Sequence, residues 1–159
     1  MKAESISTIR KEVQSMDRDE ILAILIKIIR YSTINKELAS YLLYYAQFDD
    51  LFVSEVNKEI AYSFSEIETR SAYIAKKSIR KTVRILNKYV RFSNSKNVEI
   101  EIRLFFCRQF LHGYFHKLND APLLNIYLRE IEKIKKAIGA LHEDLQSDYR
   151  IELEQLGEK

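Results

Sequence analysis

Hydrophobic residues recur at intervals of three and four along most of the chain, which is the spacing of one face of an α-helix. Near the N-terminus, Ile6, Ile9 and Val13 follow this spacing and predict a short helix over about residues 3–15. Between residues 18 and 31, Leu and Ile instead point in almost every direction around the helix axis. A helix of that kind is buried on most sides, so the pattern predicts that 18–31 lies at the centre of the core.

Polar residues mark where the first long helix begins and ends. Asp17 and Glu20 form a capping pair, because a carboxylate at this position accepts hydrogen bonds from the N–H groups of the first turn. A break at residues 32–35 then leads into a third predicted helix near 35–47.

A fourth helix is predicted near 51–63, and the basic helix that follows has two possible starts. Ser65 and Glu68 match the S-x-x-E capping box, which places its first residue there and lets it run to about Arg91. The alternative is a single continuous helix over 51–92.

Two further boundaries are marked by loop-forming residues. The sequence SNSKN at 93–97 is a loop, and a sixth helix follows over about 98–118. An Asp cap and a Pro in the first turn at 119–122 then begin a long C-terminal helix over about 122–156, with a tail that frays.

The composition agrees with these elements, since three Gly and one Pro in 159 residues are too few for turn-rich β architectures. We therefore expect an all-α fold of five to seven helices, arranged as an irregular bundle or a short helical-repeat (αα) array. The length favours one domain over 1–159.

The stretch MDRDEILAILIKIIRYSTINKELASYLLYYA, with AKKSIRK further on, resembles the opening of an uncharacterised all-helical bacterial domain family. The resemblance covers about a third of the chain. It implies an all-helical fold and brings no activity, cofactor or partner with it.

Charge is distributed very unevenly. The formal net charge is only +3, yet the window between Glu68 and Glu99 contains nine basic residues and no acidic one. Projected at about 100° per residue, residues 70–92 separate into an apolar face and a wholly cationic face. The candidate residues for binding an anionic partner are Arg70, Tyr73, Lys77, Arg80, Lys81, Arg84, Lys88 and Arg91.

Several partners for this cationic face are compatible with the sequence. The chain's own acidic segments, above all its C-terminal end, supply one set of counter-charges. An acidic protein surface or a nucleic-acid backbone is the alternative outside the chain. A membrane surface is less favoured, because the apolar face of the helix is needed for the core.

A short heptad-like pattern also suggests self-association. Ile131, Ile134, Ile138, Leu141 and Leu145 repeat at alternating intervals of three and four. This seam predicts a possible homodimer through the C-terminal helix.

Few residues have the pattern of a catalytic or metal site. His112 and His116 are four residues apart and share one helix face, but a metal needs three or four ligands, so we expect no metal and no cofactor. The single cysteine, Cys107, is expected to be a buried apolar residue. No catalytic residues are predicted, which favours a non-enzymatic protein.

No N-terminal signal peptide is visible, and the longest uncharged stretch, residues 38–48, is too short to span a membrane, so the expected compartment is the cytoplasm. Taken together, these features favour a protein-interaction or structural module. The alternative is a nucleic-acid-binding protein that uses the cationic face of helix 70–91.

Overall fold

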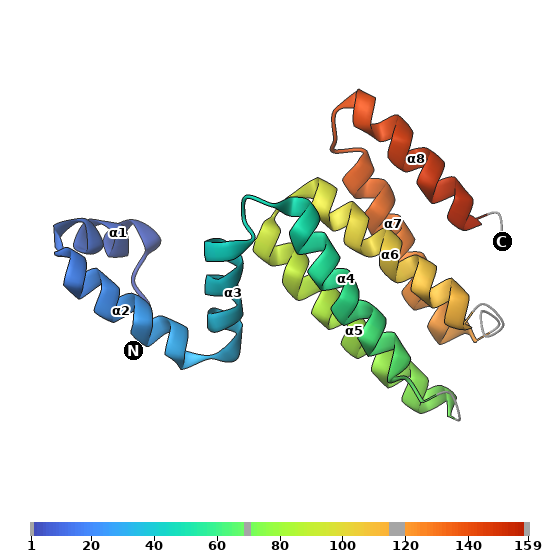
Figure 1. Cartoon of the computed structure of the whole chain (residues 1–159), viewed down its shortest axis with the longest axis horizontal. Helices are drawn as coiled ribbons and strands as arrows, with labels where there is room; N and C mark the ends of the chain where they lie inside the picture. The colour runs from blue at the N-terminus through green and yellow to red at the C-terminus, as the bar shows by residue number, and fades with distance from the viewer. Residues whose placement is uncertain (1, 69–70, 115–119, 158–159) are drawn as a thin grey trace. The chain divides into compact units, whose positions relative to one another are not determined.

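The computed structural model describes residues 2–68, 71–114 and 120–157 (Figure 1). Within these ranges the chain forms eight helices and no strand, so the all-α prediction is confirmed. The expected number of five to seven helices is one too low, because the C-terminal segment forms two helices instead of one.

Contacts along the chain divide it into two compact units, Met1–Tyr44 and Tyr45–Lys159, whereas its length favours one domain. Each unit is described by itself. The N-terminal unit contains three helices, and the C-terminal unit contains five. In chain order they are α1 (Ile6–Ser15), α2 (Arg18–Tyr31), α3 (Thr33–Tyr44), α4 (Asp49–Ser65), α5 (Ala72–Ser93), α6 (Lys96–Tyr114), α7 (Ala121–Ile138) and α8 (Glu143–Gly157).

The start of α2 is fixed by the predicted capping pair. The Asp17 carboxylate accepts hydrogen bonds from the N–H groups of Asp19 and Glu20, both at 2.9 Å. The Glu20 carboxylate accepts in turn from the Asp17 N–H at 3.0 Å, which completes the capping box. The sequence prediction is therefore confirmed at this position.

A polar turn joins α2 to α3. The Ser32 hydroxyl accepts from the Asn35 N–H at 3.1 Å, and the Asn35 amide donates to the carbonyl of Ile28 at 2.8 Å. These bonds satisfy backbone groups that the two helix ends leave without partners. In this unit, α2 and α3 are the two helices that pack extensively against each other.

The prediction that 18–31 lies at the centre of the core is wrong, since no residue of α2 is buried. Six of its Leu and Ile side chains have between 37% and 53% of their surface exposed. The sequence pattern requires neighbours on several sides, but within its unit α2 packs extensively on α3 alone. We call this set the α2 apolar surface; it consists of Ile21, Leu22, Ile24, Leu25, Ile26 and Ile28.

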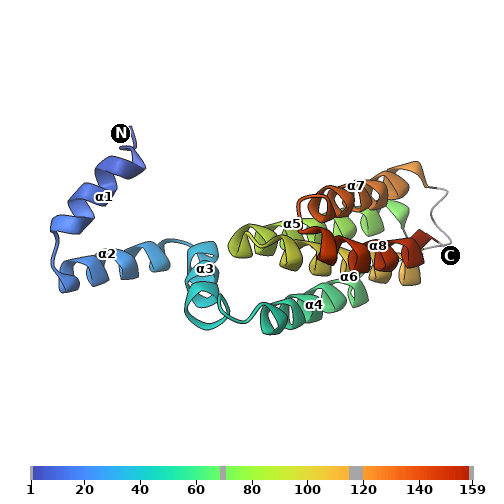
Figure 2. The same cartoon turned by 90° about the horizontal axis from the view of Figure 1, so that it is seen from above.

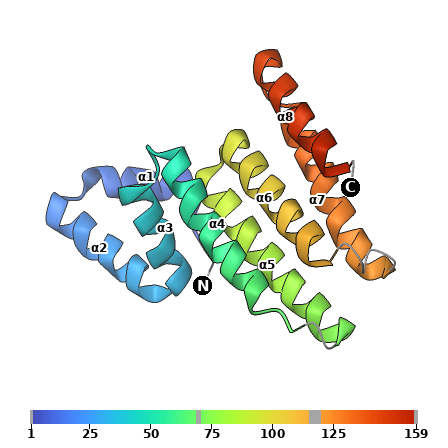
Figure 3. The same cartoon turned by 45° about the vertical axis from the view of Figure 1, so that its right-hand side comes forward.

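In the C-terminal unit, α6 is the central helix and packs against α4, α5, α7 and α8. Figure 3 shows α4 and α5 on one side of it and α7 and α8 on the other, and Figure 2 shows α7 above it and α4 below. Ile100, Leu104, Phe106 and Phe110 of α6 are completely buried. Cys107 is buried among them, as predicted.

The segment between α4 and α5 differs from both sequence predictions. Helix α4 continues to Ser65 and α5 begins at Ala72, so the chain has neither a helix start at Ser65 nor one helix over 51–92. The Ser65 hydroxyl donates to the carbonyl of Tyr62 at 2.8 Å and thus ends α4 instead of capping α5.

The predicted helix over 122–156 is also wrong as a single element. Its start is confirmed, because the Asp120 carboxylate accepts from the Leu123 N–H and Pro122 lies in the first turn. Its end is Ile138, however, and Gly139, a poor helix former, follows directly. A straight helix over 122–156 would be about 50 Å long and would project beyond the bundle. The break lets α8 fold back onto α6 and α7.

Candidate functional site

Helix α5 has the two faces that the sequence predicts. Ala75, Ile79 and Leu86 are completely buried and fix the helix to the C-terminal unit. Tyr73 and the cations Lys77, Arg80, Lys81, Arg84 and Arg91 are exposed, while Lys88 is partly buried, with its ammonium 4.2 Å from the Tyr89 ring centroid. Arg70 lies outside the described residues.

The acidic C-terminal helix does not cover this basic face. Helix α8 packs on α6 and α7, where its Glu152 pairs with Arg108 of α6 at 2.5 Å. The Tyr149 hydroxyl of α8 donates to Glu101 of α6 at 3.0 Å. Burial, together with the Glu101 carboxylate, raises the pKa of Tyr149 well above its usual range. Among the described residues no ion pair joins α8 to α5, and α8 packs on α6 and α7, so the structure does not support the hypothesis that α8 supplies the counter-charges of α5.

Five cations of α5 have no carboxylate within ion-pair distance in the described part of the chain. They are Lys77, Arg80, Lys81, Arg84 and Arg91. Like charges four residues apart on a helix repel each other, and here no internal partner relieves that repulsion. The basic face is thus available to an external anion.

Part of this face forms one wall of a groove between α5 and α7, with a volume of about 470 Å³. We call it the α5–α7 groove. Arg80 and Arg84 contribute from α5, and Arg129 and Lys133 contribute from α7. Its remaining lining residues are Val83, Pro122, Asn125, Ile126 and Glu130.

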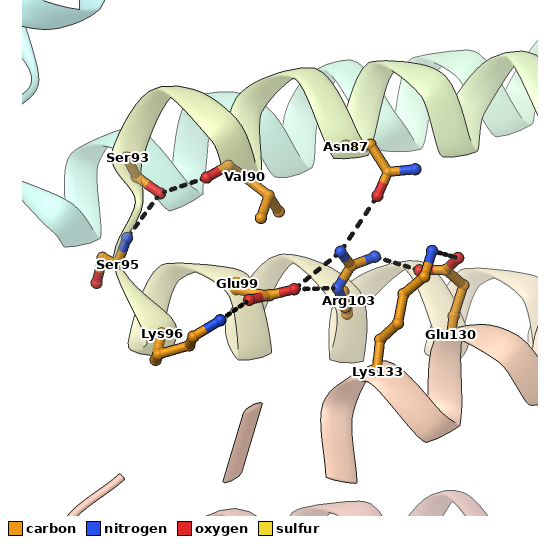
Figure 4. A network of polar contacts seen from close by, with 9 residues as sticks. All are labelled: Asn87, Val90, Ser93, Ser95, Lys96, Glu99, Arg103, Glu130 and Lys133. Carbon is orange, nitrogen blue, oxygen red and sulfur yellow. Dashed lines mark hydrogen bonds and ion pairs between the residues drawn. The ribbon is translucent and has the colours of Figure 1, made fainter. Parts of the chain in front are cut away.

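A buried ionic network holds the helices around this groove in place (Figure 4). The Arg103 guanidinium of α6, with a side chain only 4% exposed, pairs with Glu130 of α7, whose side chain is 2% exposed. It also donates to the Glu99 carboxylate at 2.9 and 3.0 Å and to the Asn87 side-chain oxygen of α5 at 3.1 Å. One guanidinium therefore joins α5, α6 and α7.

Each carboxylate of the network is already paired. The Lys133 ammonium lies 2.7 Å from the Glu130 carboxylate, which also binds Arg103, so Glu130 has two cationic partners. Burial by itself would raise the pKa of Glu99, but hydrogen bonds from Lys96 and Arg103 outweigh it and hold that pKa below its usual value. The Glu130 carboxylate is thus bound to Arg103 and Lys133, and it does not neutralise the arginines that line the groove.

Sequence reasoning found Arg80 and Arg84 but missed Asn125, Arg129 and Lys133. The reason is local, because Arg129 and Lys133 alternate along the chain with Glu130 and Glu132, which makes the segment look electrically balanced. The available signal was the spacing of Asn125, Arg129 and Lys133, which follow one another at intervals of four and so share one helix face.

Of the two histidines in the predicted pair, one lies in the described part of the chain. His112 is exposed on α6, and His116 lies outside the described residues. In the ranges that the structure describes, no group of three or more His, Cys, Asp or Glu residues is arranged to hold a metal ion.

Two of the five residues of the predicted dimerisation seam lie in the core, while Leu145 is 42% exposed. Ile134 and Ile138 are buried within the C-terminal unit, and the helix that carries them ends before Leu141. These residues are therefore not available for contact with a second copy. Among the described residues, the α2 apolar surface instead gathers six exposed Leu and Ile side chains on one helix.

Over residues 2–68, 71–114 and 120–157, no helix is both long and apolar enough to cross a lipid bilayer. Comparison with protein-family models, with curated proteins and with solved structures found no match for this chain.

Proposed function

We propose that this protein is a non-enzymatic protein-interaction module that assembles with a second copy of itself through the α2 apolar surface. The observation that carries the proposal is the exposure of six Leu and Ile side chains on one 14-residue helix. Large contiguous apolar patches are uncommon on monomeric soluble proteins and mark sites of interaction. Full burial of one such side chain is worth about 1.5–3 kcal/mol, and roughly half of that remains to be gained here.

The charges of α2 favour a second copy as the partner. Its N-terminal end carries Asp17, Asp19 and Glu20 against the single cation Arg18, and its C-terminal half carries Lys27 and Arg30. When two copies of α2 pair antiparallel about a two-fold axis, the acidic end of each lies beside the basic end of the other. The same arrangement sets the two helix dipoles in opposite directions. The surface is thus complementary to itself in both charge and apolar character.

The geometry of this pairing predicts particular contacts. Helix α2 is about 21 Å long, and its midpoint falls at Ile24 and Leu25. Around that midpoint, Asp19 of one copy lies level with Arg30 of the other, at the edge of the interface beside Ile26. Because the interface is symmetric, every such pair occurs twice.

The first experiment measures the molar mass of the full chain by size-exclusion chromatography with light scattering over a range of protein concentrations. We expect a dimer whose population grows with concentration. Leu25→Glu and Ile28→Glu place a carboxylate in the interface and should give a monomer. Ile151→Glu on α8 is the matched control, since Ile151 is 54% exposed and Ile28 is 51% exposed, and it should leave the dimer unchanged. A monomer at all concentrations, or a dimer that survives Leu25→Glu, would contradict the proposal.

A second experiment tests the antiparallel arrangement. Asp19→Arg alone and Arg30→Asp alone each bring like charges together twice, so each should weaken the dimer. The double variant Asp19→Arg/Arg30→Asp restores opposite charges and should recover most of the affinity, even though both changes oppose the helix dipole. If the double variant is as weak as the sum of the two single variants, the proposed pairing of these residues is wrong.

A further inference from the structure

We infer that the α5–α7 groove binds the phosphates of a nucleic-acid backbone. The inference is independent of the proposed self-association, because it rests on residues of the C-terminal unit alone. The groove brings together three exposed guanidinium groups from two helices, those of Arg80, Arg84 and Arg129. Its single carboxylate, Glu130, is already bound to Arg103 and Lys133, so the arginines face the groove without a counter-charge.

The residue types suit phosphate. A guanidinium presents a planar set of donors that matches two phosphate oxygens at once, which gives both strength and orientation. The exposed side-chain amide of Asn125 adds neutral hydrogen-bond donors at the same wall. Val83, Pro122 and Ile126 form apolar parts of the lining and lower the local dielectric, so charged contacts inside the groove are stronger than on an open surface.

The groove is also rigid. Arg103 fixes α6 to α7 through Glu130 and to α5 through Asn87 (Figure 4). Ile79, Thr82 and Leu86 are completely buried on the opposite side of α5. The two walls are therefore joined through Arg103 before any ligand arrives, which reduces the entropy lost on binding.

The cations extend beyond the groove, which favours a polymer over a small phosphorylated molecule. From Arg80 to Arg91 the basic row covers about 17 Å of helix axis, the rise of about five nucleotides in one strand of B-DNA. Tyr73 lies two turns before Arg80 and is 72% exposed, so its ring is placed to stack on a base at the end of this row. Lys77, between Tyr73 and Arg80, and Lys81, directly after Arg80, are both exposed. A mononucleotide would occupy the groove and leave the rest of this surface unused.

The test is a fluorescence-anisotropy titration of the full chain with labelled single-stranded and duplex DNA and RNA of mixed sequence. Titrations at about 50 mM and about 200 mM salt should differ in affinity by more than tenfold, because several counterions are released from the backbone. Arg80→Glu/Arg84→Glu should reduce the affinity at low salt by at least a hundredfold. Arg129→Glu, on the other wall, should reduce it at least tenfold.

Two controls separate the groove from general charge and from assembly. Arg10→Glu/Lys11→Glu on α1 makes the same change in net charge as Arg80→Glu/Arg84→Glu at exposed positions of the N-terminal unit, and it should leave the affinity nearly unchanged. The titration is repeated with Leu25→Glu, in which the proposed dimer is absent, and measurable binding should persist. Circular dichroism of every variant confirms that the helices are intact.

Three results would overturn the inference. One is the absence of binding at low salt, and another is an equal loss of affinity in the α1 control. The third is that a labelled ATP analogue binds as tightly as the oligonucleotides and loses as much affinity in Arg80→Glu/Arg84→Glu, which would assign the groove to a small phosphorylated ligand.

Discussion

The two units of this chain distribute hydrophobic and charged residues in opposite ways. The N-terminal unit exposes α2, a helix rich in Leu and Ile, and buries none of that helix's residues. The C-terminal unit buries two charged residues, Arg103 and Glu130, in the middle of its apolar core. A hydrophobic segment is expected to be covered by other apolar side chains. Its sequence does not say whether those side chains come from the same chain, and that depends on the fold.

The largest expected effect concerns the buried pair of the C-terminal unit. Arg103→Met should lower the free energy of unfolding by about 3–5 kcal/mol, because it leaves the Glu130 carboxylate buried without its main partner. The double variant Arg103→Met/Glu130→Leu should be more stable than Arg103→Met, since it removes both charges together. Urea unfolding followed by circular dichroism measures both values. Equal stability of the single and double variants would show that the Glu130 carboxylate carries no penalty when Arg103 is removed.

Truncation of one isoleucine in each unit tests whether the C-terminal unit buries its apolar side chains and α2 exposes them. Ile134→Ala, at a completely buried position of α7, should lower the free energy of unfolding by about 2–5 kcal/mol. Ile28→Ala on α2 should change it by less than about 0.5 kcal/mol under conditions in which the protein is monomeric. The comparison fails if the two substitutions have the same effect on the monomer.

Removal of an N-cap side chain should affect a longer part of the helix in the N-terminal unit than in the C-terminal unit. Asp17→Ala removes the acceptor of the α2 capping box and should cost about 1 kcal/mol, with faster amide exchange throughout α2, since little tertiary packing holds that helix. Asp120→Ala removes the equivalent acceptor of α7, where exchange should accelerate only in the first turn, near Leu123. Hydrogen exchange read by NMR distinguishes the two patterns. Uniform acceleration in α7 would contradict the assignment of greater local stability to that unit.

The smallest effect is the pH dependence of the ionic network. Glu99 has a lowered pKa in the folded protein, so its contribution to stability is present above its ordinary pKa near 4.5 and is lost as the pH falls through the lower folded value. Thermal unfolding measured from pH 7 down to pH 3 should show this loss for the native chain. In Glu99→Gln the curve should be flatter in that acid range, and an unchanged slope would exclude Glu99 as a contributor.

Features set by a few neighbouring residues were predictable from the sequence. The capping pair at Asp17 and the start of α7 at Asp120 depend only on hydrogen bonds within one turn, and both are found. Ser65 fits a capping pattern equally well, but its hydroxyl bonds back to Tyr62 in the preceding helix. Local patterns are therefore ambiguous where two helices compete for the same side chain.

Features that depend on distant neighbours were not predictable. The burial of α2 was overestimated because its pattern does not say which molecule covers it. Arg129 was missed because the adjacent Glu130 makes the local net charge of the sequence zero. In the fold, Glu130 is buried and pairs with Arg103. The direction in which each side chain points, and not the local charge count, creates the α5–α7 groove.

Because Cys107 is buried, its chemical modification measures how often the C-terminal unit unfolds locally. It is the only thiol in the sequence, and burial raises its pKa far above the usual range, so almost none of it is the reactive thiolate while the C-terminal unit is closed. A thiol reagent can therefore modify the chain only during excursions in which α6 leaves its neighbours. At high reagent concentration the rate of modification equals the rate at which the unit opens. The mass spectrum of a sample then gives the fraction of molecules that have opened in a given time.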